Sequence, residues 1–309
     1  MKKSKLPVPV TEKDYQDSTQ YLKTIFDFYR FALSVCSQKN IFLGHGTADI
    51  ELEFQSLILG SLQLPLDWSE QYWQARLTMP ERQFLASQLY QRLEQFIPVP
   101  YLINQAFFCG LPFYVDERVL IPRSPLAELI MQQFSPWVEP DEVEDILDLC
   151  TGSGCIAAAC AYAFPHASVD AIDIDPKALE VATLNIEQLG LQDQVRLIQS
   201  DGMNALTEEK YNIIISNPPY VGFEEMQGLP QEYNHEPRHA LEAEDNGLAF
   251  VHHILKTAKK HLKPEGILIV EVGNSDLAMM EAYPELPFIW LEFEHGGHGV
   301  FLLNAEDLP

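Results

Sequence analysis

Residues 148–157 read DLCTGSGCIA, and this stretch indicates the fold of the larger part of the chain. It ends an apolar run that has the character of a strand and leads directly into an alanine-rich run that favours a helix. Glycines at 152 and 154 let the backbone approach a ligand closely, and the helix N-terminus offers unpaired N–H groups. A tight turn without a ligand gives the same pattern, so the residues around it must decide the chemistry.

Strand-like and helical runs alternate around this glycine loop, which predicts βαβ units and an α/β, Rossmann-like parallel sheet covered on both faces. Two further strand-like runs flank the glycine-rich residues 295–299 and predict an antiparallel edge hairpin. The predicted parallel strands are Asp145–Leu149, Val169–Ile172, Val195–Ile198, Ile213–Ser216 and Gly266–Val270, and the predicted edge strands are Ile289–Phe293 and Val300–Leu303.

The N-terminal third has a different pattern, because apolar residues recur at helical spacing from Thr11 to about Ile97. We expect a small helical domain over residues 1–104, with a substrate-recognition role. The proline-rich residues 97–101 predict a break or linker, since proline removes a backbone donor and disfavours helix before it. Residues 105–124 are expected to form a linking hairpin, and residues 125–309 the catalytic domain.

Composition and charge exclude several classes of protein. The 309 residues carry a net charge of −25, and residues 105–309 hold 34 acidic and 10 basic side chains, which argues against duplex nucleic acid as a partner. No apolar run is long enough for a membrane span, and residues 1–7 lack a secretory signal, so a soluble, cytoplasmic protein is expected. The five cysteines contain no C-x-x-C pair and are expected to be buried, reduced thiols, with no metal site.

Acidic residues follow the next two predicted strands. Asp173 lies 21 residues after Gly152, where a carboxylate can accept both ribose hydroxyls of NAD or of S-adenosylmethionine. Asp201 and Gly202 follow the third strand, and Asp201 is placed to accept an adenine amino group. The alternative for each acid is a solvated turn residue. Together they predict a ribose-bearing cofactor without saying which one.

The fourth strand ends in Asn217-Pro218-Pro219-Tyr220. Two prolines remove two donors and stiffen the turn, so that carbonyl oxygens and the asparagine side chain serve as acceptors, while the tyrosine ring offers a face for stacking. Such a loop holds a planar NH2 group and directs its lone pair at a methyl sulfonium, without a dedicated general base. A rigid loop that only closes the strand is the alternative.

The order of glycine loop, Asp173, Asp201 and residues 217–220 resembles class I S-adenosylmethionine-dependent methyltransferases that modify planar amino groups. Over nearly the whole chain, the sequence resembles the protein-glutamine methyltransferase family, which pairs a helical bundle and a linking hairpin with a methyltransferase domain. The stretches that carry this resemblance are RVLIPR at 118–123, NPPY at 217–220, HEP at 235–237, DNGL at 245–248 and EVG at 271–273.

Within that family, Cys150 stands where the release-factor branch has glycine, and the chain is similar instead to the branch that methylates a glutamine of the third large-subunit ribosomal protein. Residues 123–130, 290–293 and 296–301 fit that branch too. The resemblance implies catalytic roles for Asn217, Pro218, Pro219 and Tyr220. It implies S-adenosylmethionine as cofactor, bound by Asp148, Cys150, Thr151, Gly152, Gly154, Asp173, Ile174, Asp201, Gly202 and Asn217.

The resemblance further implies a basic ribosomal protein as partner, either free or within an assembly intermediate, with no direct nucleic-acid or membrane binding. Three alternatives stay open at this point. They are a release-factor glutamine methyltransferase, a DNA adenine-amine methyltransferase that flips its base into a similar pocket, and an inactive ribosome-assembly or translation-factor binding module. The acidic surplus either steers a basic substrate or serves solubility alone.

Overall fold

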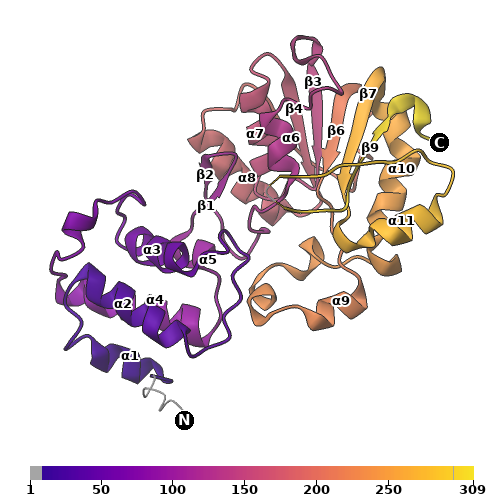
Figure 1. The fold of residues 1–309 in the computed structure, drawn as a ribbon. Helices are drawn as coiled ribbons and strands as arrows, with labels where there is room; N and C mark the ends of the chain where they lie inside the picture. The colour runs from indigo at the N-terminus through magenta and orange to yellow at the C-terminus, as the bar shows by residue number, and fades with distance from the viewer. Residues whose placement is uncertain (1–8, 295) are drawn as a thin grey trace. The chain divides into compact units, whose positions relative to one another are not determined.

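A computed structural model of the chain describes residues 9–294 and 296–309, so the predictions on residues 1–7 and on His295 lie outside the described residues. The chain divides into two compact units (Figure 1). One comprises residues up to Gln105 together with Pro230–His235, and the other comprises Ala106–Leu229 and Glu236–Pro309. We call them the helical unit and the catalytic unit.

The helices predicted between Thr11 and Ile97 are confirmed. The start of one of them shows how the sequence begins these helices. The Thr24 hydroxyl accepts a hydrogen bond from the Asp27 backbone N–H, and the Asp27 carboxylate accepts one from the Thr24 backbone N–H. This capping box satisfies two backbone donors that have no partner within the helix. The helices of this unit are α1 (Glu12–Ser18), α2 (Ile25–Cys36), α3 (Ile50–Ser61), the 3₁₀ turn η1 (Glu70–Tyr72), α4 (Met79–Glu94) and α5 (Val99–Ile103).

The helix break predicted at the proline-rich residues 97–101 is present, because α4 ends at Glu94, but these residues do not form a linker. Helix α5 begins at Val99 with Pro100 in its first turn, where the missing N–H costs nothing and the fixed φ suits a helix. The linker part of the prediction failed because it counted proline only as a helix breaker. Helix α5 ends before Asn104, which has a φ of 52°, and the chain enters the catalytic unit after Gln105.

The catalytic unit contains the predicted α/β sheet, in the order β5-β4-β3-β6-β7-β9-β8. The pairs β4–β5, β3–β4, β3–β6 and β6–β7 are parallel, whereas β7–β9 and β8–β9 are antiparallel, which confirms the fold class and the edge hairpin. The strands are β3 (Asp145–Leu149), β4 (Ser168–Asp173), β5 (Val195–Gln199), β6 (Tyr211–Ser216), β7 (Leu262–Glu271), β8 (Ile289–Trp290) and β9 (Val300–Asn304).

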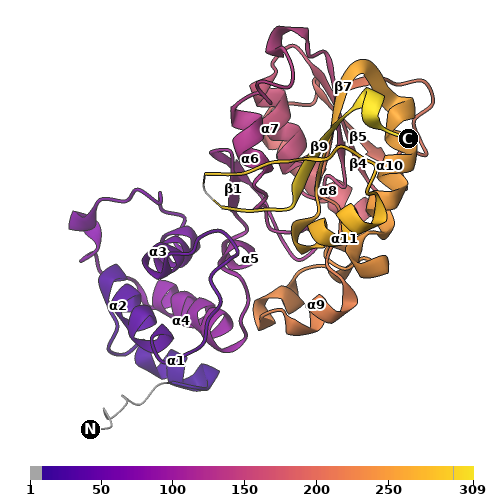
Figure 2. The same ribbon diagram turned by 45° about the vertical axis from the view of Figure 1, so that its right-hand side comes forward.

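Helices cover both faces of this sheet (Figures 1 and 2). Successive residues of β3 and β6 point to opposite faces: Ile146 and Ile213 pack in one core with α7, while Leu147 and Ile214 pack in a second core with α10. The helices are α6 (Leu126–Met131), α7 (Cys155–Ala163), α8 (Pro176–Gln188), α9 (Phe223–Gly228), α10 (Ala249–His261) and α11 (Asp276–Ala282). The 3₁₀ turns are η2 (Pro140–Glu142), η3 (Gln231–His235), η4 (Arg238–Ala240), η5 (Asp245–Gly247), η6 (Gly273–Ser275) and η7 (Ala305–Asp307).

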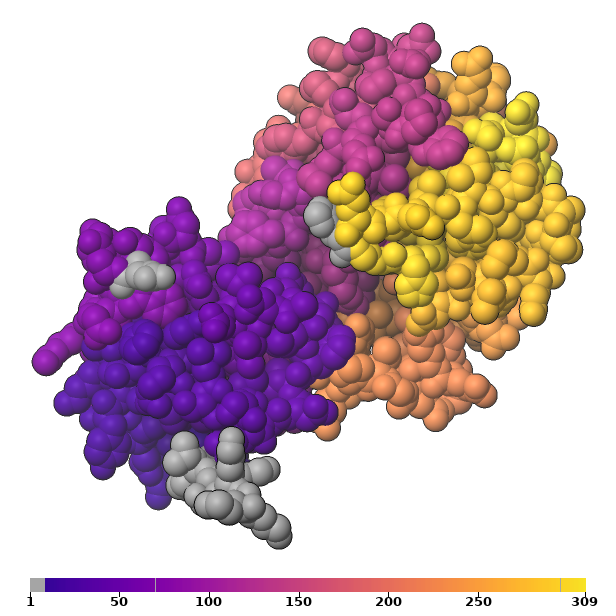
Figure 3. Space-filling view, in the orientation of Figure 1, coloured from indigo at the N-terminus to yellow at the C-terminus, as the bar shows by residue number. Residues whose placement is uncertain are grey.

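The two predicted hairpins are present with shorter strands. Strand β1 (Ala106–Phe108) pairs with β2 (Leu111–Phe113), and β8 extends only to Trp290 where the sequence predicted a strand to Phe293. The Leu291 N–H still donates to the Val300 carbonyl, and further along the chain Gly296 and Gly297, both at positive φ, form part of the turn between the strands. Part of the C-terminal segment, yellow in Figure 3, is visible on the surface of the catalytic unit, whereas Val300–Leu303 are buried.

All five cysteines carry free thiols, but the prediction that all are buried was wrong: Cys109 and Cys150 are only partly buried, because both lie at turns with positive φ. Within residues 9–294 and 296–309, no helix is long and apolar enough to cross a membrane. The same residues contain no group of three or more histidine, cysteine or acidic side chains that could hold a metal ion.

Candidate active site

The glycine loop turns sharply at the carboxyl end of β3. Cys150, Gly152 and Gly154 all have positive φ, at 62°, 55° and 79°. A Cβ on Gly152 would meet nothing within 4 Å, so glycine is needed there for its φ and not for space. A Cβ on Gly154 would approach the Ala182 Cβ to 3.3 Å, so this glycine also lets α7 begin close against α8. Cys150 adopts the left-handed conformation without being glycine.

Asp148 holds the glycine loop in place through buried hydrogen bonds. Its Oδ2 accepts hydrogen bonds from the Thr151 hydroxyl at 2.6 Å and from the Ala157 N–H at 3.0 Å, while its Oδ1 has no partner among the described residues. The carboxyl is fully buried, and burial raises its pKa to about 7, with the nearby Asp173 charge adding to the shift. The observed hydrogen bonds show that Asp148 supports the glycine loop. Its contact with the cofactor stays a prediction.

Asp173 connects the ends of β3 and β4. Its Oδ2 accepts from the Gly152 N–H and its Oδ1 from the Asp175 N–H, both at 2.9 Å. These strands are parallel neighbours in register, which brings their carboxyl ends to the same edge of the sheet. Burial raises the pKa of Asp173, although both backbone hydrogen bonds favour its ionised form. Each oxygen keeps a lone pair for a further donor.

A cavity opens at this edge, and six of the predicted site residues line it: Cys150, Thr151, Gly152, Asp173, Ile174 and Asn217. The Asn217 side chain makes no hydrogen bond within the described part of the chain, so its amide is available to a ligand in this cavity. The other predicted residues do not line the cavity. They are Asp148, Gly154, Asp201, Gly202, Pro218, Pro219 and Tyr220.

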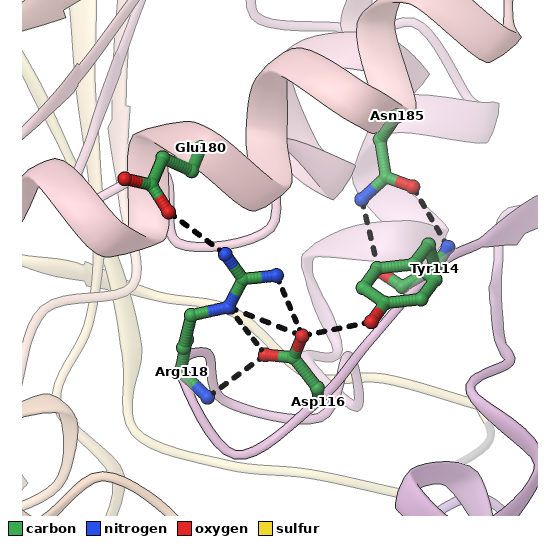
Figure 4. A network of polar contacts seen from close by, with 5 residues as sticks. All are labelled: Tyr114, Asp116, Arg118, Glu180 and Asn185. Carbon is green, nitrogen blue, oxygen red and sulfur yellow. Dashed lines mark hydrogen bonds and ion pairs between the residues drawn. The ribbon is translucent and has the colours of Figure 1, made fainter.

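Five polar residues that sequence reasoning left without a role also line the cavity: Arg118, Arg123, Ser124, Ser153 and His239. Arg118 is part of the network in Figure 4, in which its guanidinium donates to Asp116 and, at 2.9 Å, to Glu180 of α8. Asn185 joins the same network from α8. It exchanges hydrogen bonds with the Tyr114 backbone and donates to the Ser153 carbonyl of the glycine loop.

Arg123 is fixed by a buried carboxylate from far along the sequence. Its two terminal nitrogens donate to Glu236 at 2.6 and 2.8 Å, and the same carboxylate accepts the Ile121 N–H at 3.0 Å. This bidentate pair holds the wall of the cavity formed by residues 121–124. Both residues lie in stretches that carry the family resemblance, but nothing in the sequence pairs them.

Tyr220 is held in the same way. Its hydroxyl donates to Glu271 Oε1 at 2.7 Å, and Glu271 Oε2 accepts from the Ser124 hydroxyl at 2.5 Å. Burial raises the pKa of Glu271. Gly273 packs against the tyrosine ring so closely that a Cβ there would lie 2.6 Å from Tyr220 Cε2. The ring is therefore locked between β7 and the loop that follows it.

A family model, the methyltransferase small domain, matches residues 127–287. The ribosomal protein uL3 glutamine methyltransferase of Francisella tularensis is 42% identical to this chain, over 96% of this chain and 95% of that protein. The protein of the same name from Neisseria meningitidis serogroup B is 45% identical, over 95% of this chain and 97% of that protein. This chain belongs to the family of the ribosomal protein uL3 glutamine methyltransferases.

Membership confirms the predicted resemblance, the fold as that of a class I methyltransferase, and S-adenosylmethionine as the methyl donor. Among solved structures, a methyltransferase from Pyrococcus furiosus is 20% identical over 63% of this chain and 89% of that chain, with a TM-score of 0.48. The family assignment rests on the two relatives.

The cavity suits the methyl donor chemically. A ribose needs a carboxylate with free lone pairs, which Asp173 supplies, and a positively charged sulfonium is favoured beside acceptors such as the Asn217 side-chain oxygen. Cys150, Thr151 and Gly152 bring backbone to the same wall. The residues present therefore fit the cofactor of this family.

Proposed function

We propose that this chain transfers a methyl group from S-adenosylmethionine to the side-chain amide nitrogen of a glutamine in ribosomal protein uL3. One observation carries the proposal: two proteins named for that activity are 42% and 45% identical to this chain over nearly its full length. The Asn217–Tyr220 loop, held through Tyr220 by Glu271, supports an active enzyme over an inactive binding module.

In this proposal, Asp173 accepts the ribose hydroxyls with the lone pairs that its two backbone hydrogen bonds leave free. The backbone at Cys150, Thr151 and Gly152 and the side chain of Ile174 line the cavity and would hold the cofactor there. Asp201 does not line the cavity, and its contact with the adenine amino group is proposed from its place after β5 alone. Gly154 and Gly202 keep the backbone close to neighbouring residues. Asp148 supports the glycine loop by accepting hydrogen bonds from Thr151 and Ala157.

Asn217 and the Pro218 carbonyl accept the two N–H bonds of the glutamine amide, which fixes the amide plane and returns electron density to its nitrogen. Pro219 stiffens the turn, and the Tyr220 ring, locked by Glu271, supplies the face on which the amide packs. The bound cofactor supplies a methyl group on a positively charged sulfur. Transfer of that group to the amide nitrogen would leave the nitrogen acidic, and its proton would pass to water, so no side chain would have to act as a base.

We propose that the substrate meets the enzyme in the cytoplasm as a basic protein, free or within an assembly intermediate. Residues 105–309 carry 34 acidic and 10 basic side chains, which favours encounter with a basic protein and disfavours nucleic acid. If the acidity serves solubility alone, the methylation rate will not respond to ionic strength.

The experiment uses labelled S-adenosylmethionine with three substrates prepared from cells that lack this enzyme: free uL3, ribosomal precursor particles and mature ribosomes. Label is expected on one glutamine of uL3, located by mass spectrometry of its peptides. The comparison of free protein with particles identifies the form that is methylated. Label on a release factor or on DNA, with none on uL3, would overturn the proposal.

A further inference from the structure

The helical unit has a cavity of its own, lined by side chains of α2, α3 and the segment that follows α3. Helices α2 and α3 lie next to each other in Figure 2. Four aromatic residues and two acids define its chemistry: Phe26, Tyr29, Trp68, Trp73, Glu51 and Asp67. Nothing in the proposed methyl transfer uses any of them.

The aromatic rings form a rigid wall. The Tyr29 and Trp73 rings meet edge to face with centroids 4.8 Å apart, and Trp73 is only 8% exposed. Phe26 leaves 43% of its surface open beside them. Aromatic rings held in this way present π-faces, which attract cations. Aliphatic side chains would fill the same volume without offering such faces.

The charge at the rim has one sign. Glu51 and Asp67 are exposed and form no ion pair with any described residue. The charge of Glu51 is felt inside the cavity, because Glu51 and Asp49 add to the effect of burial in raising the pKa of Tyr29. A cavity with aromatic walls and an acidic rim favours a cation over a neutral or anionic group.

The tryptophans supply an independent observation. The indole N–H groups of Trp68 and Trp73 are buried and have no acceptor among the described residues, although both rings line this cavity. A buried donor without an acceptor is unfavourable, so such groups are usually satisfied by a partner or by water. Because both N–H atoms are enclosed, a peptide carbonyl reaches one of them only when its ring shifts on ligand binding.

We propose that this cavity binds an arginine side chain of the protein substrate, with the adjacent substrate carbonyl accepting an indole N–H. Arginine fits better than lysine because its flat guanidinium can stack on the rings while its N–H groups reach two carboxylates at once. The inference rests on the proposed function for the identity of the partner, since ribosomal proteins are basic. The chemistry of the cavity does not depend on it.

A binding experiment tests the cavity without methyl transfer. The indole N–H resonances of the full chain are followed by NMR during titration with N-acetyl-arginine amide, N-acetyl-lysine amide or N-acetyl-glutamine amide. The variants W68F and W73F assign the two resonances. The arginine compound is expected to shift both in a saturable way, the lysine compound less, and the neutral compound not at all. No shift with arginine, or an equal shift with the neutral compound, overturns the proposal.

A kinetic experiment tests the consequence for the substrate. The double variant Glu51→Gln, Asp67→Asn and the variant Trp73→Phe are each expected to raise the KM for uL3 about tenfold with kcat unchanged, the size expected of a desolvated cation–π contact. The matched controls are Glu12→Gln, Asp17→Asn, which removes two exposed acids of α1, and Trp137→Phe in the catalytic unit. An unchanged KM in the cavity variants, or the same rise in the controls, overturns the proposal.

The two proposals fail in different ways. If uL3 is not methylated but the arginine compound still shifts Trp68 and Trp73, the cavity binds arginine and the assigned substrate is wrong. If uL3 is methylated and neither resonance moves, the substrate is right and the arginine site is wrong. A larger shift with the lysine compound than with the arginine compound overturns the choice of arginine.

Discussion

The part of the site proposed to bind the cofactor and the part proposed to bind the methyl-accepting amide are built in different ways. We call them the cofactor side and the acceptor side. On the cofactor side, the contacts that hold the loop are local: Asp148 and Thr151 are three residues apart, and Gly152 and Asp173 are 21 apart. On the acceptor side, Tyr220 and Glu271 are 51 residues apart, Arg123 and Glu236 are 113 apart, and Ser124 and Glu271 are 147 apart. The first side is therefore visible as a sequence motif, whereas the second depends on the assembled fold.

The largest effect is expected where the acceptor side is held by one buried carboxylate. Glu236→Ala leaves Arg123 without its bidentate partner and the Ile121 N–H without its acceptor. The free energy of unfolding should fall by about 3 kcal/mol, because the guanidinium loses its bidentate carboxylate and the Ile121 N–H loses its buried acceptor. Urea denaturation measures it. The control Glu242→Ala breaks the exposed pair with Arg238 and should cost much less. Equal losses of unfolding free energy in the two variants would contradict a larger contribution from the Arg123–Glu236 pair.

Asn217→Ala tests the acceptor side directly. Loss of the side-chain acceptor should raise the barrier to transfer by about 3–4 kcal/mol, seen as a fall in kcat, as for removal of one preorganised hydrogen-bonding group. The dissociation constant of S-adenosylmethionine, measured by calorimetry, should change little. Asn204→Ala removes an exposed asparagine of the same unit and serves as the control. Near-normal turnover of the Asn217 variant would contradict its assigned role.

These two variants show what the sequence could and could not predict. The parallel sheet with its antiparallel edge, the glycine loop and the cavity residues Asp173 and Asn217 could be predicted from sequence patterns, because parallel strands bring the motifs at their carboxyl ends together. The pairing of Arg123 with Glu236 did not follow, because it depends on how two loops 113 residues apart fold back on each other. His239 has no motif at all, and only the structure places it at the cavity.

Asp173→Ala reverses the pattern expected for Asn217. The ribose hydroxyls lose a charged acceptor and the Gly152 N–H loses its partner, so the affinity for S-adenosylmethionine should fall by about 1.5–3 kcal/mol. With saturating cofactor, kcat should recover much of its value. Asp170→Ala, on the same strand, removes the carboxylate that pairs with Arg196 and should leave cofactor affinity unchanged. An unchanged affinity in the Asp173 variant would remove the assigned contact with the ribose.

The pKa of Asp148 adds a pH dependence on the cofactor side. Burial raises this pKa from 3.8 to about 7, so the native protein binds a proton that the unfolded chain has released. The contribution of Asp148 to stability is therefore fully present at low pH and is lost as the pH rises from about 4 to 7. Over the pH unit below 7, the free energy of unfolding should fall by at most about 1.4 kcal/mol relative to that of Asp148→Asn. Parallel stability curves for the two proteins would contradict the raised pKa.

The smallest effect is expected at Cys150, which stands where the release-factor branch has glycine. Its φ of 62° costs a side-chain-bearing residue about 1–2 kcal/mol, which Cys150→Gly should recover. Glycine in turn loses about 0.5–1 kcal/mol through the greater freedom of the unfolded chain, and the packing of the thiol is lost as well. These contributions oppose each other, so the free energy of unfolding should change by less than about 1 kcal/mol. The cofactor dissociation constant should change little, because the backbone keeps its path.

Cys109→Gly, at another positive φ of 49°, is the matched control, since it lies outside the cofactor cavity. If Cys150→Gly weakens cofactor binding severalfold while Cys109→Gly does not, the thiol itself contacts the cofactor and the cofactor side is not held by its backbone alone.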